Sequence, residues 1–472
     1  MTALGTTAHA SSRRAVQAAP PRLPTPLWWA DVVGGAAILS LVVVTALWVH
    51  HGGLADLQAG YGAGAIAAGR LAGLLAADLL LLQVLGMARI PWAERSFGQD
   101  RLARWHRLAG FTSFHLMLAH IVLVTAGYAA TSRRAVLREL WDLVANYPGM
   151  LLAAAASGLL VVVVGLSIRA ARRRLRYESW HLIHLYAYLG VGLALPHQLW
   201  TGADFVASPV ARLYWWGLYG VALASILTFR LGLPAWRSLR HRLEVAAVVP
   251  EAPGVVSVHL RGRRLDRLPV RAGQFFVWRF LDGAGWSRGH PYSLSAAPHR
   301  SMMRITVKDL GDGSGGLASV RPGTRAVIEG PYGRLTGEVR TRRRVTMIAA
   351  GIGVTPMRAL LEELRFASGE AVLLYRTSSE ADVIFRAELD KLARKRGVRV
   401  VYLPGPRARG RSWLPSSLGQ QSDEAGLRML VPGIAAHDVF VCGPDLWMDA
   451  VRDAALAAGV PPANVHLERF TW

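Results

Sequence analysis

Two stretches decide the fold of this chain: WHRLAGFTSFHLMLAHIVLV at residues 105–124 and WHLIHLYAYLGVGLALPHQLW at residues 180–200. Both are apolar, and each has about the 20 residues that a helix needs to cross the hydrocarbon core of a bilayer. Each carries two histidines about four turns apart: His106 and His120 in the first, His184 and His197 in the second. Because an imidazole is costly in hydrocarbon unless it faces a partner, this pattern indicates bis-histidine ligation of two haems.

Helix geometry supports the first pair directly. At about 100° and 1.5 Å per residue, the step from His106 to His120 returns to within about 40° of the same face and covers about 21 Å, so one helix can serve two haems. The step from His184 to His197 ends about 140° away on a regular helix. Pro196, which directly precedes His197, can bend or rewind that turn.

Three nearby residues have alternative interpretations. His115 lies about 180° from His106 and is expected to be a packing residue. His181, one turn before His184, could replace it as a ligand. Arg70, at the outer start of a predicted span, could anchor the membrane boundary by snorkelling or offer positive charge beside the outer haem, to a propionate or a reduced anion.

Apolar windows recur only in the first half of the chain. Hydrophobic residues make up 52% of 472, and the mean hydropathy is +0.27. Windows of about 20 apolar residues predict six membrane spans, at 27–49, 68–88, 108–128, 149–168, 181–200 and 209–230. We therefore expect a multi-domain membrane protein whose six-helix transmembrane bundle occupies 27–230.

The arginines predict the orientation. Loops 89–107 and 169–180 carry five arginines each, loops 50–67 and 201–208 carry none, and loop 129–148 carries three. By the positive-inside rule, this pattern predicts a multi-pass protein of the cell membrane with both termini in the cytoplasm.

The net charge of +23 indicates attraction to the anionic headgroups of a lipid bilayer. No module that stacks on or reads bases is recognisable, which argues against nucleic-acid binding. Residues 1–26 contain Arg13, Arg14 and several prolines and predict a disordered cytoplasmic leader, because no small-residue cleavage site precedes a soluble chain.

Cys442 is the single cysteine. One thiol cannot build a Cys₄ iron–sulfur cluster, a zinc ribbon or an internal disulfide. The electron carriers must therefore be organic or haem.

The composition changes at residue 231. A short connector at 231–240 leads to β-type segments at 244–249, 255–260, 274–280, 304–307 and 326–329. They predict an antiparallel β-barrel over 241–341, a type of domain that commonly holds a flavin.

Two strings in this region suit a flavin. In HPYSLS, residues 290–295, the ring of Tyr292 can stack on the isoalloxazine while Ser293 or Ser295 hydrogen-bonds its polar edge. In KDLGDGSGGL, residues 308–317, a glycine-rich turn enters a short helix whose amides can hold a pyrophosphate.

Residues 342–472 predict an α/β nucleotide-binding domain. The strand 345–350 runs into GIGVTP at 351–356 and a helix at 357–365, and the last strand ends in CGP at 442–444. The glycines lie where a backbone must approach a phosphate. Arg376, after the second strand, could pair with a ribose 2′-phosphate and favour NADPH over NADH, or could be a solvated residue at a strand end.

The order of these motifs resembles that of the transmembrane NADPH oxidases and ferric reductases over nearly the whole chain. This resemblance implies a ferric-reductase-type six-helix domain followed by ferredoxin-reductase-like FAD and NADPH domains. It makes His106 and His184 the ligands of a cytoplasmic-side haem b, and His120 and His197 those of an outer haem b.

The resemblance also implies the residues of the soluble sites. Those expected at FAD are His290, Pro291, Tyr292, Ser293 and Ser295, together with Lys308, Gly315 and Gly316 of the glycine-rich turn. Those expected at the NADPH phosphates are Gly351, Gly353, Thr355 and Pro356. Cys442 and Gly443 would lie beside the nicotinamide. An aromatic ring near the C-terminus would stack on the flavin, with Phe470 as the best match and Trp472 as the alternative.

The expected function is electron transfer across the membrane. Electrons would pass from cytoplasmic NADPH through FAD, the inner haem and the outer haem to an external acceptor. FAD is needed because NADPH gives two electrons and haem accepts one. The expected acceptor is O₂, giving superoxide, and a ferric chelate is the close alternative. A membrane subunit that feeds a quinone or a partner protein is an alternative of a different class.

Overall fold

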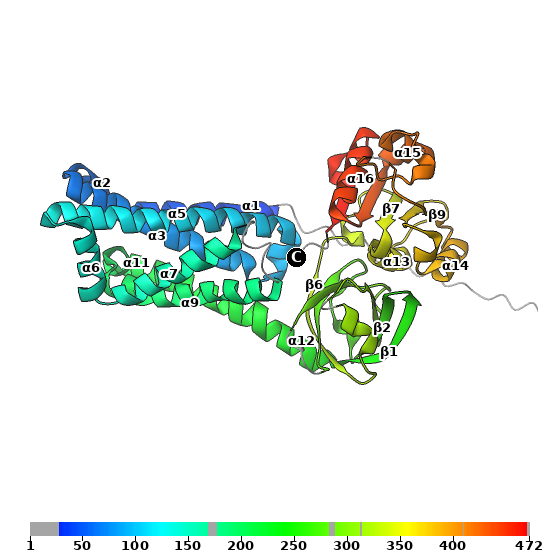
Figure 1. The fold of residues 1–472 in the computed structure, drawn as a ribbon, viewed down its shortest axis with the longest axis horizontal. Helices are drawn as coiled ribbons and strands as arrows, with labels where there is room; N and C mark the ends of the chain where they lie inside the picture. The colour runs from blue at the N-terminus through cyan, green and yellow to red at the C-terminus, as the bar shows by residue number, and fades with distance from the viewer. Residues whose placement is uncertain (1–27, 169–176, 283–287, 312–313, 409, 470–472) are drawn as a thin grey trace, which may run out of the picture.

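The computed structural model describes residues 28–168, 177–282, 288–311, 314–408 and 410–469. An elongated bundle of helices lies at one end of the molecule, and two domains that contain sheets lie at the other (Figure 1). The expected leader, all five arginines of loop 169–180, and both Phe470 and Trp472 lie outside the described residues.

The bundle is built from helices of very different lengths. In chain order they are α1 (Trp28–His50), α2 (Gly53–Gln58), α3 (Tyr61–Met87), α4 (Pro91–Phe97), α5 (Gln99–Ser132), α6 (Val136–Asn146), α7 (Met150–Ser167), α9 (Tyr177–Thr201), α10 (Ala203–Val206), α11 (Pro209–Ser225), the π-helical segment η1 (Ile226–Gly232) and α12 (Leu233–His241).

Five helices of the described chain are long and apolar enough to cross a membrane. They are Trp28–His50, Tyr61–Met87, Arg101–Ser132, Met150–Ser167 and Pro209–His241. The sixth expected span, at 181–200, is not among them. Its helix α9 has 25 residues, but its histidines, tyrosines, Pro196 and Gln198 lower the hydropathy, so the groups that give α9 its chemistry also weaken its membrane signal.

The connector expected at 231–240 is helical. Helix α11 continues through the π-helical segment η1 into α12, which has Pro234 in its first turn. A proline removes one backbone donor and clashes with the carbonyl four residues earlier, and a π-helical turn relieves such a clash. The last membrane helix therefore runs directly into the soluble part.

Helices α3 and α5 approach closely because glycines face each other between them. A Cβ atom added at Gly62 would lie 2.6 Å from Oγ1 of Thr131, and one added at Gly127 would lie 2.7 Å from the carbonyl oxygen of Gly62. Small residues give membrane helices their close contacts, since lipid supplies no hydrophobic drive for helix association.

The first soluble domain is an antiparallel sheet with the strand order β4-β3-β6-β1-β2-β5. Its strands are β1 (Leu243–Ala252), β2 (Val255–Arg261), β3 (Phe275–Phe280), β4 (His290–Ser293), β5 (Met302–Lys308) and β6 (Arg325–Tyr332). Its core includes Leu260, Phe276, Trp278 and Ile305. The described edge strands β4 and β5 meet only through an isolated bridge, Leu294 to Ile305, so the sheet is not the closed barrel that the sequence predicts.

The second soluble domain is a parallel sheet with helices on both faces. Strands β7 (Arg344–Ala350), β8 (Ala371–Arg376), β9 (Arg399–Leu403), β10 (His437–Cys442) and β11 (Val465–Glu468) lie in the order β11-β10-β7-β8-β9. Helices α13 (Val354–Glu363) and α14 (Arg386–Arg396) share one core with the sheet, and α15 (Asp423–Leu430) and α16 (Asp445–Ala457) share the other.

Asp438, at the start of β10, attaches this domain to the segment that joins the two sheets. Its side chain is fully buried. Oδ1 accepts from Asn464 and His466, and Oδ2 accepts from the backbone amides of Thr341 and Arg342. Burial alone would raise the pKa of Asp438, but these hydrogen bonds hold it below its usual range.

We expect Asp438→Asn to lower the free energy of unfolding of the nucleotide domain by about 2–4 kcal/mol, because an amide NH₂ in either orientation leaves two buried donors without an acceptor. The carboxylate's contribution is present above its unfolded pKa of about 3.9 and is lost as pH falls through the lower folded value. Scanning calorimetry measures the difference in free energy of unfolding between wild type and variant. This difference should be constant from neutral pH down to about 5 and should become smaller below about 4.

Asp453→Asn is the matched control, because Asp453 pairs with Arg452 at an exposed site and should change stability little. Equal effects of the two substitutions would contradict the role assigned to Asp438.

Candidate functional site

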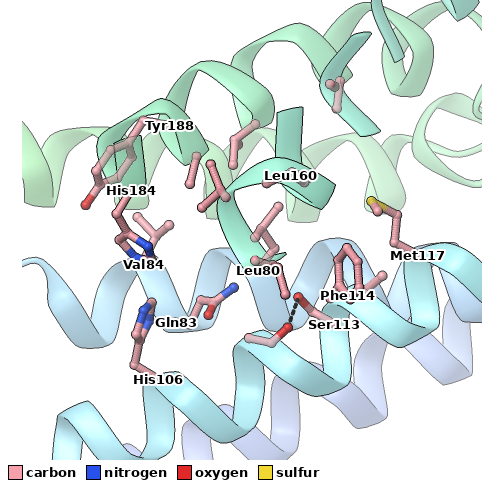
Figure 2. Close-up of a pocket in the computed structure, with 18 of the residues that line it drawn as sticks. Leu80, Gln83, Val84, His106, Ser113, Phe114, Met117, Leu160, His184 and Tyr188 are labelled. Atoms are coloured by element: carbon pink, nitrogen blue, oxygen red, sulfur yellow. Dashed lines mark hydrogen bonds between the residues drawn. The ribbon is translucent and has the colours of Figure 1, made fainter. Parts of the chain in front are cut away.

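The structure brings the four histidines together as two facing pairs. The ring centroids of His106 and His184 are 5.7 Å apart, and those of His120 and His197 are 6.1 Å apart. Figure 2 shows His106 on α5 and His184 on α9 pointing toward each other. Two imidazoles that share one iron need centroids about 6 Å apart, since each iron–nitrogen bond takes about 2 Å. Both pairs therefore fit one haem iron each.

Hydrogen bonds set the tautomers of two of these rings. Nδ1 of His120 lies 2.8 Å from the carbonyl oxygen of Gly69, which can only accept, so Nδ1 carries the proton. The Ser167 hydroxyl donates to the carbonyl of Val163 and accepts from Nδ1 of His184 at 3.3 Å. Both rings are thus held with Nε2 as the lone-pair donor, the form that ligates a metal.

Two glycines make room for the outer pair. A Cβ atom at Gly73 of α3 would lie 2.6 Å from Nδ1 of His120. Gly149, at φ +79° before α7, packs against Pro196 and His197, and a Cβ atom there would lie 2.8 Å from the backbone nitrogen of His197. The backbones of α3 and of the turn before α7 therefore wall the second pair.

One cavity of about 2010 Å³ connects these parts. All four histidines line it, and so do Arg70, His290 and Glu468. Sites for a single small molecule commonly measure about 300–1,000 Å³, so this cavity has room for more than one prosthetic group.

Two buried polar atoms of the cavity wall have no hydrogen-bond partner among the described groups. They are Nδ1 of His106 and Oε1 of Gln83, and Gln83 appears beside His106 in Figure 2. Buried polar groups are normally satisfied, so these two atoms mark a wall that a bound group or water completes.

The neighbouring residues take distinct places. His115 is exposed on the outside of α5, where its Nδ1 donates to the carbonyl of Phe111 at 2.7 Å. His181 lines the cavity. Arg70 makes two 2.8 Å hydrogen bonds to Asp204 and one of 3.2 Å to Asp56. Its charge is therefore already balanced by carboxylates at the cavity wall.

Strand β4 carries the expected flavin residues to the mouth of the cavity. His290 and Pro291 line the cavity, and the rings of His290 and Tyr292 stack at 6.1 Å. Burial raises the pKa of the Tyr292 phenol. The hydroxyl oxygen of Ser293 is buried without a partner among the described groups, which suits a bond to the polar edge of a flavin.

Ser295 is hydrogen-bonded inside the protein. It is fully buried, and its hydroxyl oxygen accepts from Arg304 at 3.1 Å and from Thr306 at 2.8 Å. Both lone pairs of the hydroxyl oxygen are therefore used inside the protein, and its O–H hydrogen is left to donate. A hydrogen bond from Ser295 to the flavin stays a prediction.

The glycine-rich turn is closed largely by its own bonds. Lys308 ends β5, and the amide of Gly315 donates to the carbonyl of Gly311 at 3.1 Å rather than outward. Gly316 follows in a short 3₁₀ helix at Gly315–Ser319, with no neighbour within 4 Å of an added Cβ atom. Residues 312–313 lie outside the described residues.

The expected nucleotide residues gather where β7 and β10 end. Gly351, at φ +53°, is exposed with open space around it, and a Cβ atom at Gly353 would lie 2.3 Å from the carbonyl oxygen of Cys442. Thr355 and Cys442 are buried, and burial raises the pKa of the Cys442 thiol. The carboxyl ends of parallel strands are where such folds bind nucleotides, and here the backbone rather than these side chains is presented.

The rest of this loop follows the same pattern. Pro356 is buried in the first turn of α13. A Cβ atom at Gly443 would lie 3.0 Å from that of Ala350. These positions hold the two strand ends close together and present no functional side chain.

Arg376 is not a solvated residue. Its side chain is buried and donates to the carbonyls of Thr377 and Leu403, while Nε has no partner among the described groups. Burial and the charge of Arg407 lower its pKa.

Sequence reasoning missed the groups that hold the site. Gly73, Ser167 and Arg304 are examples. The alternation of the strand Met302–Lys308 directs Met303 and Ile305 into the domain core and puts Arg304 on the opposite face, so the sequence gives no local sign that Arg304 is buried.

Comparisons with known proteins agree with this architecture. Residues 72–195 match the model of the ferric reductase like transmembrane component, and residues 347–453 match the oxidoreductase NAD-binding domain. Ferredoxin--NADP reductase B of Sorangium cellulosum is 32% identical over 48% of this chain and 96% of its own length.

Other matches concern the same half. The ferredoxin reductase component of 3-ketosteroid-9-alpha-monooxygenase of Mycolicibacterium smegmatis is 33% identical, and the match covers 48% of this chain and 65% of that protein. The flavohem-like FAD/NAD binding domain of nitric oxide dioxygenase from Vibrio cholerae O1 biovar El Tor is 25% identical with a TM-score of 0.39, over 48% of this chain and 97% of its own. The chain spans just under two thirds of the length of the first of these relatives.

The chain thus combines a ferric-reductase-like transmembrane component with a domain similar to those of NAD-binding oxidoreductases. The chain belongs to the family in which a ferric-reductase-like transmembrane component is fused to a ferredoxin–NADP reductase-like module.

Proposed function

We propose that this protein carries electrons from cytoplasmic NADPH through FAD and two bis-histidine haems to an acceptor across the membrane, with O₂ as the acceptor and superoxide as the product. The observation that carries the proposal is the single cavity that both histidine pairs line and that reaches His290 of the flavin strand. The group that feeds electrons and the groups that receive them would then share one cavity.

Each part of this chain has a defined task in the proposal. The two histidine pairs would hold the haem irons, and β4 with Ser293 would hold the flavin edge. A bound FAD would take two electrons as a hydride from NADPH, leaving NADP⁺, and release them singly to haem. Arg376 would favour NADPH through its 2′-phosphate, and Phe470 or Trp472 would cover the flavin.

The membrane topology is also part of the proposal. Helix α9 would be the sixth span, since it packs along α7 within the bundle. The arginine-rich loops and both termini would lie in the cytoplasm.

Two other acceptors have specific support. The matching transmembrane family is described as ferric reductase like, which favours a ferric chelate. The relative from Mycolicibacterium smegmatis is the ferredoxin reductase component of a monooxygenase, which favours electron delivery to a partner protein or, in a membrane, to a quinone.

The acceptor can be identified with the purified full-length chain supplied with FAD, haem and NADPH. We expect reduction of cytochrome c in air that superoxide dismutase abolishes. If the chain reduces an Fe(III) chelate under argon faster than it forms superoxide in air, the ferric chelate is the acceptor instead. Reduced haem that persists in air and reacts with neither acceptor would contradict both and favour the partner-protein or quinone alternative.

Histidine substitutions should remove haems in pairs. His106→Ala and His184→Ala should each abolish the same low-spin haem signal, and the double variant should lose no more than either single one, because both residues hold one iron. His120→Ala and His197→Ala should abolish the other signal. His115→Ala should abolish neither. One haem per wild-type chain in a pyridine haemochrome assay would refute the two-haem proposal.

Gly73→Ala should disturb only the outer haem. Its Cβ atom would lie 2.6 Å from Nδ1 of His120 and would push that ring from its place. The reduced spectrum should keep the inner-haem signal and lose or shift the outer one. Gly86→Ala on the same helix is the matched control, since its Cβ atom meets nothing within 4 Å. Identical spectra for the two variants would show that Gly73 does not shape the site.

A further inference from the structure

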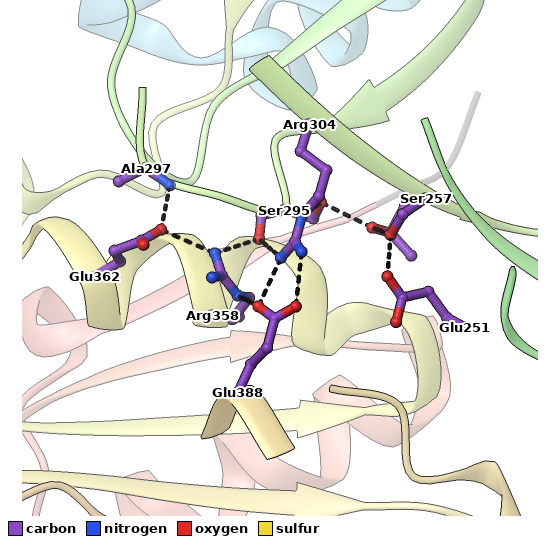
Figure 3. A network of polar contacts seen from close by, with 9 residues as sticks. Glu251, Ser257, Ser295, Ala297, Arg304, Arg358, Glu362 and Glu388 are labelled. Carbon is purple, nitrogen blue, oxygen red and sulfur yellow. Dashed lines mark hydrogen bonds and ion pairs between the residues drawn. The ribbon is translucent and has the colours of Figure 1, made fainter. Parts of the chain in front are cut away.

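A buried polar network joins the flavin domain to the nucleotide domain, and the electron path described above does not use it (Figure 3). Its central members are Ser295 after β4, Arg304 on β5, Arg358 on α13 and Glu388 on α14. The first two belong to the flavin domain and the last two to the nucleotide domain.

Glu388 is the carboxylate that both arginines share. Arg304 donates to its two oxygens at 2.8 and 3.1 Å, a bidentate arrangement, and Nε of Arg358 donates at 2.5 Å. Charge-assisted bidentate bonds are the strongest and most directional of protein hydrogen bonds. The network therefore defines an orientation as well as an attraction.

Ser295 links the same arginines to the flavin strand. Its hydroxyl oxygen accepts from Nε of Arg304, and its carbonyl oxygen accepts from Arg304 and from Arg358, both at 2.9 Å. Ser295 lies two residues after Ser293, the last residue of β4. One end of the network is therefore attached to the strand that presents the flavin residues.

The other end is attached to the nucleotide loop. Arg358 lies on the helix that begins at Val354, immediately after the GIG turn at Gly351–Gly353. Arg358 also bonds Glu362 one turn later at 2.8 Å, and Glu362 accepts from the backbone amide of Ala297 at 2.8 Å. Glu362 thus makes a second hydrogen-bonded connection between the same helix and the segment after β4.

The two guanidinium groups of the network are buried, whereas the side chain of Glu388 is 35% exposed. Arg304 and Arg358 are each 8% exposed. Burial alone would raise the pKa of Glu388, but the hydrogen bond from Arg304 and the charges of both arginines hold it below its usual range. Removing the carboxylate would leave the buried guanidinium of Arg304 without an anionic partner in this network, while Arg358 would keep its ion pair with Glu362. Glu388 is therefore the group that links the charge of the flavin domain to the nucleotide domain.

We propose that Arg304, Arg358 and Glu388, with Ser295 as their hub, are positioning residues that hold the flavin strand against the nucleotide loop and so set the approach of the nicotinamide to the flavin. This inference rests on the proposed transfer of a hydride from NADPH to FAD. None of the four residues has to touch either group.

Glu388→Gln in the full-length chain tests the proposal. Under argon, in stopped-flow measurements of flavin absorbance, the limiting rate of reduction at saturating NADPH should fall by about 10- to 100-fold, since small misplacements of reacting groups have effects of that size. The dissociation constant for NADPH should change little, because the phosphate loop is untouched. Hydrogen exchange of the amides at 294–297 and 386–396 should quicken, with or without bound flavin.

Glu424→Gln is the matched control. Glu424 also pairs with an arginine in the nucleotide domain, Arg428 at 3.0 Å, but at an exposed site far along the chain from the network. It should leave the limiting rate and the exchange pattern as in the wild type.

Arg304→Met and Arg304→Lys keep the test decisive if Glu388→Gln fails to fold. Arg304→Met leaves Glu388 paired with Arg358 and should still lower the limiting rate, and Arg304→Lys should restore part of it. Limiting rates equal to that of Glu424→Gln in every folded variant would overturn the positioning role. A wild-type flavin that NADPH does not reduce would instead overturn the proposed function.

Discussion

An imidazole in hydrocarbon must be satisfied at both ring nitrogens, and this requirement organises the membrane half of the protein. Each pair of rings faces across the space between α5 and α9. Two of the remaining nitrogens turn to other helices: Nδ1 of His120 to the carbonyl of Gly69 on α3, and Nδ1 of His184 to Ser167 on α7. Nδ1 of His106 has no partner among the described groups. Four helices are therefore arranged around two pairs of side chains, and the glycines of α3 are what allow the close approach.

The soluble half obeys the same rule with charges in place of imidazoles. Buried carboxylates and guanidinium groups are stable only when they are paired. The structure puts these groups where segments meet. Asp438 holds the backbone that links the two sheets, and Glu388 joins arginines from both domains. An apolar core also crosses this boundary, because Val255, Ala272 and Leu335 pack into the core of the nucleotide domain. The two soluble domains are thus joined both by an apolar core and by ion pairs.

The three parts meet at strand β4. Family comparisons match the membrane helices at 72–195 and the nucleotide domain at 347–453 separately, and the flavin strand lies between these regions in the sequence. In space, His290 and Pro291 open onto the cavity that the four histidines line, while Ser295 at the other end of the same segment is attached to the nucleotide helix. A segment of six residues thus links the nucleotide loop to the membrane site.

The sequence by itself determined the features that depend on local pattern. Apolar windows located the five helices that are long and apolar enough to cross a membrane, the spacing of the histidines selected α5 and α9, and the order of HPYSLS, GIGVTP and CGP predicted the family that the comparisons show. These signals are legible because composition and periodicity act over a few turns of chain. The hydropathy of α9 indicates a membrane span only weakly, because its polar side chains lower it.

Only the tertiary structure decided where each side chain points. Ser293 and Ser295 are two residues apart and share one face of an ideal strand. The hydroxyl oxygen of Ser293 nevertheless has no partner among the described groups, whereas that of Ser295 accepts hydrogen bonds from Arg304 and Thr306. Arg376 and the connector at 231–240 show the same limit. Arg376 donates to the carbonyl of Leu403 on the neighbouring strand β9, and the connector continues α11 as a helix through the π-helical segment η1. Such outcomes depend on groups far away in the sequence, which local pattern cannot encode, because a buried polar atom takes whichever partner the packed chain brings within reach.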